Sequence, residues 1–267
     1  MKAKRPLLMG ILNVTPDSFS DGGKFNTLEK AVLQGLKMAD DGADIIDVGG
    51  ESTRPGSQPV EVSEEIKRVV PVIKNLKKRI SIPISVDTYK SEVARAAIDA
   101  GAEIINDITA LNGDKKMGEL AAKNKVTVVL MHMQGSPATM QLKPKYKNVV
   151  QEIILFLKDR IEKAKEYGIK DDRIVIDPGI GFGKTVEHNL KIIKNLKEFA
   201  ILKKQILIGP SRKSFIGKIL DLDASQRCEG SAAAISMSVA NGANIVRVHD
   251  IKEMKRVVEI TWRICSA

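Results

Sequence analysis

The sequence predicts an α/β fold of the (β/α)8 TIM-barrel type, and two features of the chain lead to that prediction. Eight short apolar, β-branched segments recur along the 267 residues, and amphipathic stretches separate them. Barrels of this type are commonly single domains of ~250 residues. We therefore expect one domain over 1–267. An open doubly wound sheet is the alternative, but a count of eight strands favours the barrel over it.

The eight apolar segments are too short for buried helices and too continuous for strands with one face in water. Such segments are typical of parallel strands that are covered on both sides. Each is therefore expected to be one strand of the barrel. They lie at 7–12, 44–49, 83–87, 103–108, 126–132, 173–177, 205–208 and 244–248.

The stretches between the strands have the period of amphipathic helices. Apolar residues recur three and four positions apart, as at Leu28, Ala31 and Val32, so one helix face is apolar. The segments 13–27 and 51–62 lack this period and are rich in Gly, Ser, Pro and charge. We expect them to form loops on one face of the barrel. A glycine follows four of the helical stretches, where a left-handed terminus favours it: Gly42, Gly101, Gly168 and Gly242.

Composition excludes several classes of protein. The longest apolar runs, such as 126–131, fall far short of the ~20 residues that cross a bilayer. The net charge of +10 permits an anionic partner, but aromatic residues make up only 4% of the chain and offer little for base stacking. We expect a small anionic substrate and no nucleic acid. The basic N-terminus lacks a cleavage site, and Cys228 and Cys265 form no disulfide framework, so a cytoplasmic location is expected.

Polar residues of chemical interest follow nearly every expected strand. In a (β/α)8 barrel the catalytic face is the one where the strands end. Wet loops explain one or two polar residues there, but not a whole set that converges on one rim. The central members of this set are Asp87, Asn106, Asp177, Lys213 and Arg247.

Familiar site motifs do not account for this set. The segment 179–185 follows a strand, but Pro178 stands where a Walker loop needs its first Gly, and Lys184 replaces the third Gly of a dinucleotide motif. The three histidines are far apart in sequence, which disfavours a catalytic zinc. A Schiff-base role for Lys213, as in an aldolase barrel, is an alternative that the residues leave open.

The residue types at the rim indicate the kind of ligand. A carboxylate can accept two parallel N–H bonds, so carboxylates beside an Asn amide suit a polar heterocycle with a guanidine-like edge. Arg54, Arg247 and His249 supply positive charge nearby, which suits a phosphorylated group. The residues therefore predict a polar ring that carries an anionic tail.

Two long motifs carry a family resemblance. The segments 9–23 (MGILNVTPDSFSDGG) and 49–56 (GGESTRPG) resemble the first and second loops of dihydropteroate synthases. Six shorter motifs follow in that family's order, and together they cover nearly the whole chain. They are SVDT at 85–88, NDI at 106–108, MHMQ at 131–134, DPGIGF at 177–182, SRKSFIG at 211–217 and VRVHD at 246–250.

The resemblance implies a reaction and its participants. The enzyme would join 6-hydroxymethyl-7,8-dihydropterin diphosphate to 4-aminobenzoate, giving 7,8-dihydropteroate and diphosphate, a step of folate synthesis. It implies Mg²⁺ as the cofactor, held between Asn13 and the diphosphate and completed by Asp21 when the first loop closes. The family's habit also implies a homodimer. A pterin-binding module that is non-catalytic or transfers a methyl group is the alternative.

The resemblance also implies residue roles. Asp177 and Asn106 would bind the amino-pyrimidinone edge of the pterin, while Arg247 would stack on its face. Asp87, Lys213, Arg247 and His249 would be the catalytic residues. The pterin site would also include Asp87 and Lys213. The diphosphate would be held by Asn13, Thr53, Arg247 and His249, and Arg54 and Met131 would be further substrate-binding residues. The aminobenzoate pocket would be lined by Phe19, Pro55, Phe182 and Ser214.

Overall fold

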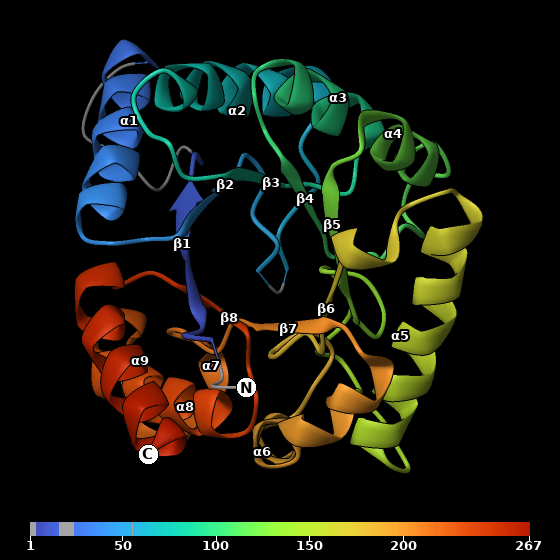
Figure 1. The fold of residues 1–267 in the computed structure, drawn as a ribbon, viewed down its shortest axis with the longest axis vertical. Coiled ribbons are helices and arrows are strands. Elements are labelled where there is room, and N and C mark those ends of the chain that lie inside the picture. The colour runs from blue at the N-terminus through green and yellow to red at the C-terminus, as the bar shows by residue number, and fades with distance from the viewer. Residues whose placement is uncertain (1–3, 16–23, 55) are drawn as a thin grey trace.

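Eight parallel strands close into a barrel, and helices surround it (Figure 1). The structure is a computed structural model that describes residues 4–15, 24–54 and 56–267. It confirms the predicted (β/α)8 fold, and each strand end lies within one residue of its expected position. The strands are β1 (Leu7–Asn13), β2 (Ile45–Gly49), β3 (Ile84–Asp87), β4 (Ile104–Asp107), β5 (Thr127–Met131), β6 (Ile174–Asp177), β7 (Gln205–Ile208) and β8 (Ile245–Val248).

Helices connect the strands and cover the outside of the barrel (Figure 1). One expectation was wrong, because α1 begins at Lys24, inside the segment 13–27 that was expected as a loop. None of the helices in the described ranges is long and apolar enough to span a bilayer. The α-helices are α1 (Lys24–Asp40), α2 (Val62–Lys77), α3 (Ser91–Asp99), α4 (Met117–Asn124), α5 (Val149–Glu166), α6 (Val186–Lys194), α7 (Ser214–Leu220), α8 (Cys228–Ala240) and α9 (Ile251–Ser266). Short 3-10 turns lie at Asp171–Arg173, Leu196–Leu202 and Ala224–Gln226.

The four glycines expected at helix ends adopt the left-handed backbone. Their φ angles lie between +91° and +114°. At Gly101 a side chain would also meet the stem of Lys77, since an added Cβ would lie 2.7 Å from Lys77 Cγ. Glycine therefore ends these helices and lets the chain turn back toward the next strand, which after Gly168 is preceded by the 3-10 turn Asp171–Arg173.

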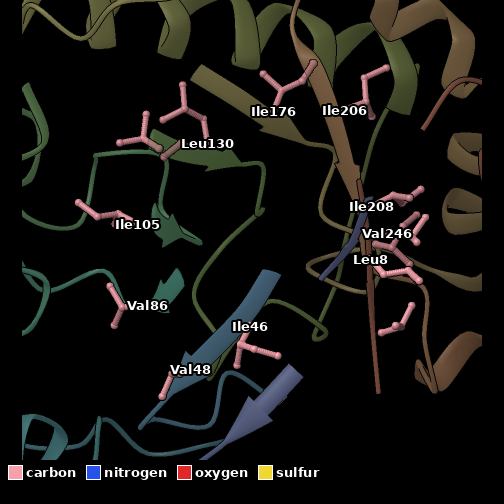
Figure 2. Close-up of a cluster of buried hydrophobic side chains, with 14 of the residues drawn as sticks. Leu8, Ile46, Val48, Val86, Ile105, Leu130, Ile176, Ile206, Ile208 and Val246 are labelled. Carbon is pink, nitrogen blue, oxygen red and sulfur yellow. The ribbon is translucent and has the colours of Figure 1, made fainter. Parts of the chain in front are cut away.

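Successive side chains of each strand point alternately outward and inward. The outward-facing residues pack under the helices, and Figure 2 shows members of this cluster from all eight strands, among them Leu8, Ile105 and Val246. The inward-facing residues form a separate apolar layer: Met9, Ile45, Val129, Val175, Leu207 and Ile245. This layer fills the barrel below its carboxyl end, so the barrel has a packed floor.

The same alternation fixes which polar residues point inward above this floor. Asp47 is two residues after Ile45 on β2, Asp177 is two after Val175 on β6, and Arg247 is two after Ile245 on β8. Asp87 pairs in register with Asn106 of β4. The alternation of side chains along the strands therefore brings charged and amide groups to one level inside the barrel, directly above the apolar floor.

Candidate active site

The centre of the site is an arginine between two carboxylates. Arg247 Nε donates to Asp47 Oδ2 at 2.6 Å, and its Nη2 donates to Asp87 Oδ2 at 2.7 Å. Asp47 is fully buried, and Asp87 is almost fully buried. Buried charges persist where they are paired and hydrogen-bonded, so these three groups hold one another in place.

Asn106 extends this network to the neighbouring strand. Its Nδ2 donates to Asp47 Oδ2 at 3.0 Å, the same oxygen that Arg247 contacts. Among the described residues, the other oxygens of both carboxylates, Asp47 Oδ1 and Asp87 Oδ1, have no hydrogen-bond partner. The network therefore keeps acceptor capacity beyond what the protein itself uses.

Burial sets the protonation of Asp87. Removal from water raises the pKa of this carboxyl to about 7, against the opposing attraction of the Arg247 guanidinium. The nearby charge of Asp47 raises the pKa further. A carboxyl with this pKa is poised to change charge near neutrality, which is a frequent property of functional sites.

Asp177 ends β6 and is held by the turn that follows. Its Oδ1 accepts the N–H of Gly179 at 2.7 Å, which leaves Oδ2 for a ligand. Burial raises the pKa of Asp177 to about 6, so this carboxylate is charged at pH 7. Gly179 has φ +70°, and a Cβ there would lie 2.0 Å from the carbonyl oxygen of His132, so only glycine fits this turn.

Lys213 and Phe182 lie on two different loops and contact each other. The Lys213 Nζ lies 4.2 Å from the centre of the Phe182 ring, a cation–π contact. Burial and the charge of Arg247 lower the pKa of Lys213 to about 8. Ser214, the first residue of α7, is exposed beside Lys213, while Met131 is buried with Phe182 in a small apolar cluster.

Lys184, a buried lysine at a position that fits no motif in the sequence, holds these loops together. Lys184 Nζ lies 3.0 Å from His132 Nδ1 and donates to the carbonyl oxygen of Phe182 at 2.9 Å. Burial lowers the pKa of Lys184 to about 7. It therefore ties the end of β5 to the loop that carries Phe182.

His249 lies beside Ser211 at the mouth of the barrel. The Ser211 hydroxyl accepts the backbone N–H of His249 at 3.2 Å and lies 3.1 Å from its Nδ1. Burial and the charge of Arg247 lower the pKa of His249 to about 3. The sequence suggests positive charge here, and in the ligand-free site this lowered pKa favours the neutral imidazole. If Ser211 donates to Nδ1, the ring proton lies on Nε2, and His249 offers a hydrogen-bond donor.

The second loop is anchored at both ends. Glu51 accepts from Lys90 Nζ at 2.5 Å and from the backbone of Val60 at 2.8 Å. Lys90 also donates to the Val60 carbonyl oxygen at 2.6 Å. Between these anchors Thr53 is half-buried and Arg54 is exposed, so both can be reached by a ligand at the barrel mouth.

Asn13 stands at the end of β1 opposite Gly49 of β2. A Cβ on Gly49 would lie 3.7 Å from Asn13 Oδ1 and 3.5 Å from Asp87 Cβ, so Gly49 lies directly between these two side chains. Phe19, Asp21 and Pro55, which the resemblance implicates, lie outside the described residues. The described ranges contain no group of three or more acidic, His or Cys side chains arranged to hold a metal ion.

The structure thus brings together Asp87, Asn106 and Asp177 with Lys213 and Arg247. Sequence reasoning missed Asp47, which joins two of them. A signal was available, because an Asp inside an otherwise apolar strand is rarely buried without a partner. Its position two residues before Gly49 also gives it the inward-facing parity.

Comparisons with known proteins show the family of this chain. Residues 9–249 match the model of the pterin binding enzyme family. Dihydropteroate synthase of Synechocystis is 45% identical over 264 residues, covering 97% of this chain and 91% of the relative. A structure of the Clostridium difficile dihydropteroate synthase in the presence of pteroic acid has a TM-score of 0.94 and 45% identity, covering 99% of this chain and 98% of that one.

A second solved structure carries the other type of ligand. Dihydropteroate synthase of Xanthomonas albilineans with 4-aminobenzoic acid has a TM-score of 0.93 and 44% identity, covering 98% of this chain and 94% of that one. Sequence identity at this level over nearly the full length of both chains shows a shared family as well as a shared fold. The chain belongs to the dihydropteroate synthases, within the family of pterin-binding enzymes.

Proposed function

We propose that this enzyme transfers the dihydropterinylmethyl group of 6-hydroxymethyl-7,8-dihydropterin diphosphate to 4-aminobenzoate, forming 7,8-dihydropteroate and diphosphate. One observation carries the residue roles: Asp87, Asn106 and Asp177 share one level of the barrel interior with Arg247. Acceptors and an amide at that level suit the edge of a pterin ring. His249 and Asn13, at the rim above, suit the diphosphate.

The first chemical step is the departure of diphosphate. The carbon–oxygen bond breaks, and its electron pair leaves with the diphosphate while Arg247 and the Nε2 donor of His249 stabilise the growing charge. The methylene carbon becomes a cation that is delocalised into the pterin. The Asp87 carboxylate, when ionised, places a negative charge in a buried setting where it stabilises this cation.

The second step is the attack of the aromatic amine. The neutral nitrogen of 4-aminobenzoate forms the carbon–nitrogen bond with its lone pair and then loses a proton to solvent. No strong base is needed for this order of events, which fits a site whose Lys213 and Asp177 serve to bind the ring. Phe182, Ser214 and the second-loop residue Pro55 are proposed to line the aminobenzoate pocket, together with Phe19.

Magnesium fits the residues present at the rim. Mg²⁺ is commonly held by one or two protein oxygens plus substrate phosphates, and Asn13 Oδ1 is such an oxygen. We propose that Asn13 and Asp21 bind the ion with the diphosphate, with Thr53 and Arg54 on the anchored second loop contacting the same group. When bound, the ion would neutralise negative charge on the leaving group.

We also propose that two copies of the chain form a homodimer. Large apolar side chains are exposed on the neighbouring helices α7, α8 and α9, and apolar patches of this kind favour association. Light scattering should give twice the 29.2 kDa chain mass, and a monomer would contradict the proposal. The exposed apolar side chains on these helices are Ile219, Leu220, Met237, Ile260 and Ile264.

The cytoplasmic location stays a prediction.

The reaction is tested by mixing the purified enzyme with pterin diphosphate, 4-aminobenzoate and Mg²⁺. Diphosphate and 7,8-dihydropteroate should form in equal amounts, and leaving out the enzyme should abolish both. Binding of the pterin with no product formation would instead identify a pterin-binding module without transferase activity. Borohydride with a carbonyl substrate should trap no adduct on Lys213, as a Schiff-base aldolase would require.

A further inference from the structure

Asp47 occupies an unusual place beneath the proposed pterin site. It lies in the middle of β2, is fully buried, and faces the barrel interior through the parity of the strand. Its Oδ2 accepts from both Asn106 and Arg247. Because none of its surface is exposed, Asp47 does not contact a ligand itself, and its hydrogen bonds reach the ligand site through these two neighbours.

We propose that Asp47 is a positioning residue that fixes which way the Asn106 amide faces the pterin. The inference rests on the proposed function, since it assumes that the pterin edge contacts Asn106. An amide side chain can turn over and exchange its oxygen and nitrogen with little change in shape. Something in the protein must therefore select one of the two orientations.

The charge state of Asp47 makes that selection. The Arg247 guanidinium lies 2.6 Å from the same oxygen, so Asp47 is a carboxylate and can only accept hydrogen bonds. The atom of Asn106 that faces it must then be the NH2 group. The opposite orientation would bring the amide oxygen against the buried Asp47 Oδ2, where two acceptors face each other and the amide oxygen has no donor.

The selected orientation leaves a defined pattern for the ligand. One N–H of Asn106 is used by Asp47, so the amide oxygen and the second N–H remain. An acceptor beside a donor complements a ring edge on which an amino group is next to a ring nitrogen, as in the pyrimidinone half of a pterin. If the amide were reversed, its NH2 group would face the amino group of the ligand, and two hydrogen-bond donors would oppose each other.

A double-mutant cycle separates this role from an effect through Arg247. The probe is 6-hydroxymethyl-7,8-dihydropterin, which lacks the diphosphate, and its affinity is measured by calorimetry. We expect Asp47→Asn to weaken binding about tenfold or more, because a neutral amide that can itself turn over replaces a carboxylate that can only accept hydrogen bonds. With Asn106→Ala already present, Asp47→Asn should add less than about threefold, since coupled residues are not additive.

A matched control uses the same substitution immediately before the start of the same strand. Asp44, immediately before β2, pairs with Arg5 at 2.6 Å and accepts the backbone N–H of Leu8 at 2.8 Å. Asp44→Asn should leave pterin affinity unchanged. In steady-state kinetics, Asp47→Asn should raise the KM for pterin diphosphate and leave the KM for 4-aminobenzoate unchanged, a split that a general loss of structure would not produce.

An exchanged pair tests the inference even if the single Asp47 variant does not fold. Asn106→Asp alone places two carboxylates against each other, whereas Asp47→Asn with Asn106→Asp restores one donor and one acceptor and keeps the net charge. The pair should bind the pterin at least about tenfold more tightly than Asn106→Asp alone. No improvement, or fully additive losses in the cycle, would overturn the role of Asp47. Failure of the wild-type enzyme to bind the pterin would instead overturn the proposed function.

Discussion

The Arg247 guanidinium donates a 2.7 Å hydrogen bond to Asp87, a residue 160 positions earlier in the chain. In the proposed mechanism these two groups stabilise charges of opposite sign. Arg247 serves the departing diphosphate, and Asp87 serves the cation that remains. In the ligand-free site each neutralises the other, so neither charge is exposed without a partner before substrate binds.

The first prediction concerns the edge of the pterin. In Asp177→Asn the new amide should turn its oxygen to the N–H of Gly179, the partner that Asp177 Oδ1 has now at 2.7 Å. Its NH2 group then faces the donors of the ligand. We expect pterin binding to weaken by about 2–4 kcal/mol, measured by calorimetry, because a charge-assisted bond is replaced by two opposed donors.

The control for this variant is Asp114→Asn. Asp114 likewise accepts backbone N–H groups, here from Ser91 and Lys116, but it lies in the loop before α4. It should lower stability without changing pterin affinity. Near-native affinity in Asp177→Asn would remove Asp177 from the pterin site.

The second prediction concerns the leaving group. Arg247→Ala removes a charged contact that should strengthen as the carbon–oxygen bond breaks. Pre-organised charge of this kind is typically worth ~3 kcal/mol, so the single-turnover rate should fall about a hundredfold. Rapid-quench measurement at saturating substrate isolates this rate. A raised KM with an unchanged chemical step would show that Arg247 only binds the ground state.

The third prediction is a narrow bell-shaped pH profile for kcat/KM. Below its pKa of about 7 Asp87 is protonated and loses the charge that stabilises the cation, so the rate should rise with pH through this value. Above its pKa of about 8 Lys213 loses its proton, so the rate should then fall.

Two variants assign the limbs of this profile. Arg247→Gln should move the acid limb to higher pH, because the guanidinium now lowers the pKa of Asp87. Lys213→Arg should remove the alkaline limb, since a guanidinium keeps its charge across this range. An alkaline limb that persists unchanged in Lys213→Arg would assign it to another group.

The fourth prediction concerns the order of binding. Phe182 belongs to the buried framework, whereas Phe19 and Pro55 come from the first and second loops. If the loops complete the aminobenzoate pocket only when diphosphate and magnesium are bound, 4-aminobenzoate alone should bind poorly. Calorimetry should show tighter binding once both are added. Equal affinity in the two conditions would contradict assembly of the pocket by the loops.

The fold could be predicted from the sequence because each barrel strand has a strong local signal. The apolar runs, the helical periods and glycines such as Gly101 all depend on short-range chemistry, and the strand ends then indicate where Asp87 and Asp177 converge. Asp47 was missed because its importance lies in partners on β4 and β8, far away in sequence. The lowered pKa of His249 could not be predicted either, since it comes from burial and from the neighbouring Arg247. Lys184 matches no motif in the sequence, and its role depends on a contact with His132 that only the structure shows.

Positional isotope exchange tests most directly whether diphosphate leaves before the amine attacks. The oxygen that bridges the methylene carbon and the diphosphate is labelled, and the enzyme is incubated with Mg²⁺ and benzoate, which lacks the attacking amine. If the cation forms reversibly beside Asp87, the label should spread to non-bridging oxygens of the same phosphoryl group in recovered substrate. A label that stays in place, under conditions where 4-aminobenzoate is converted efficiently, would contradict this account and indicate concerted displacement.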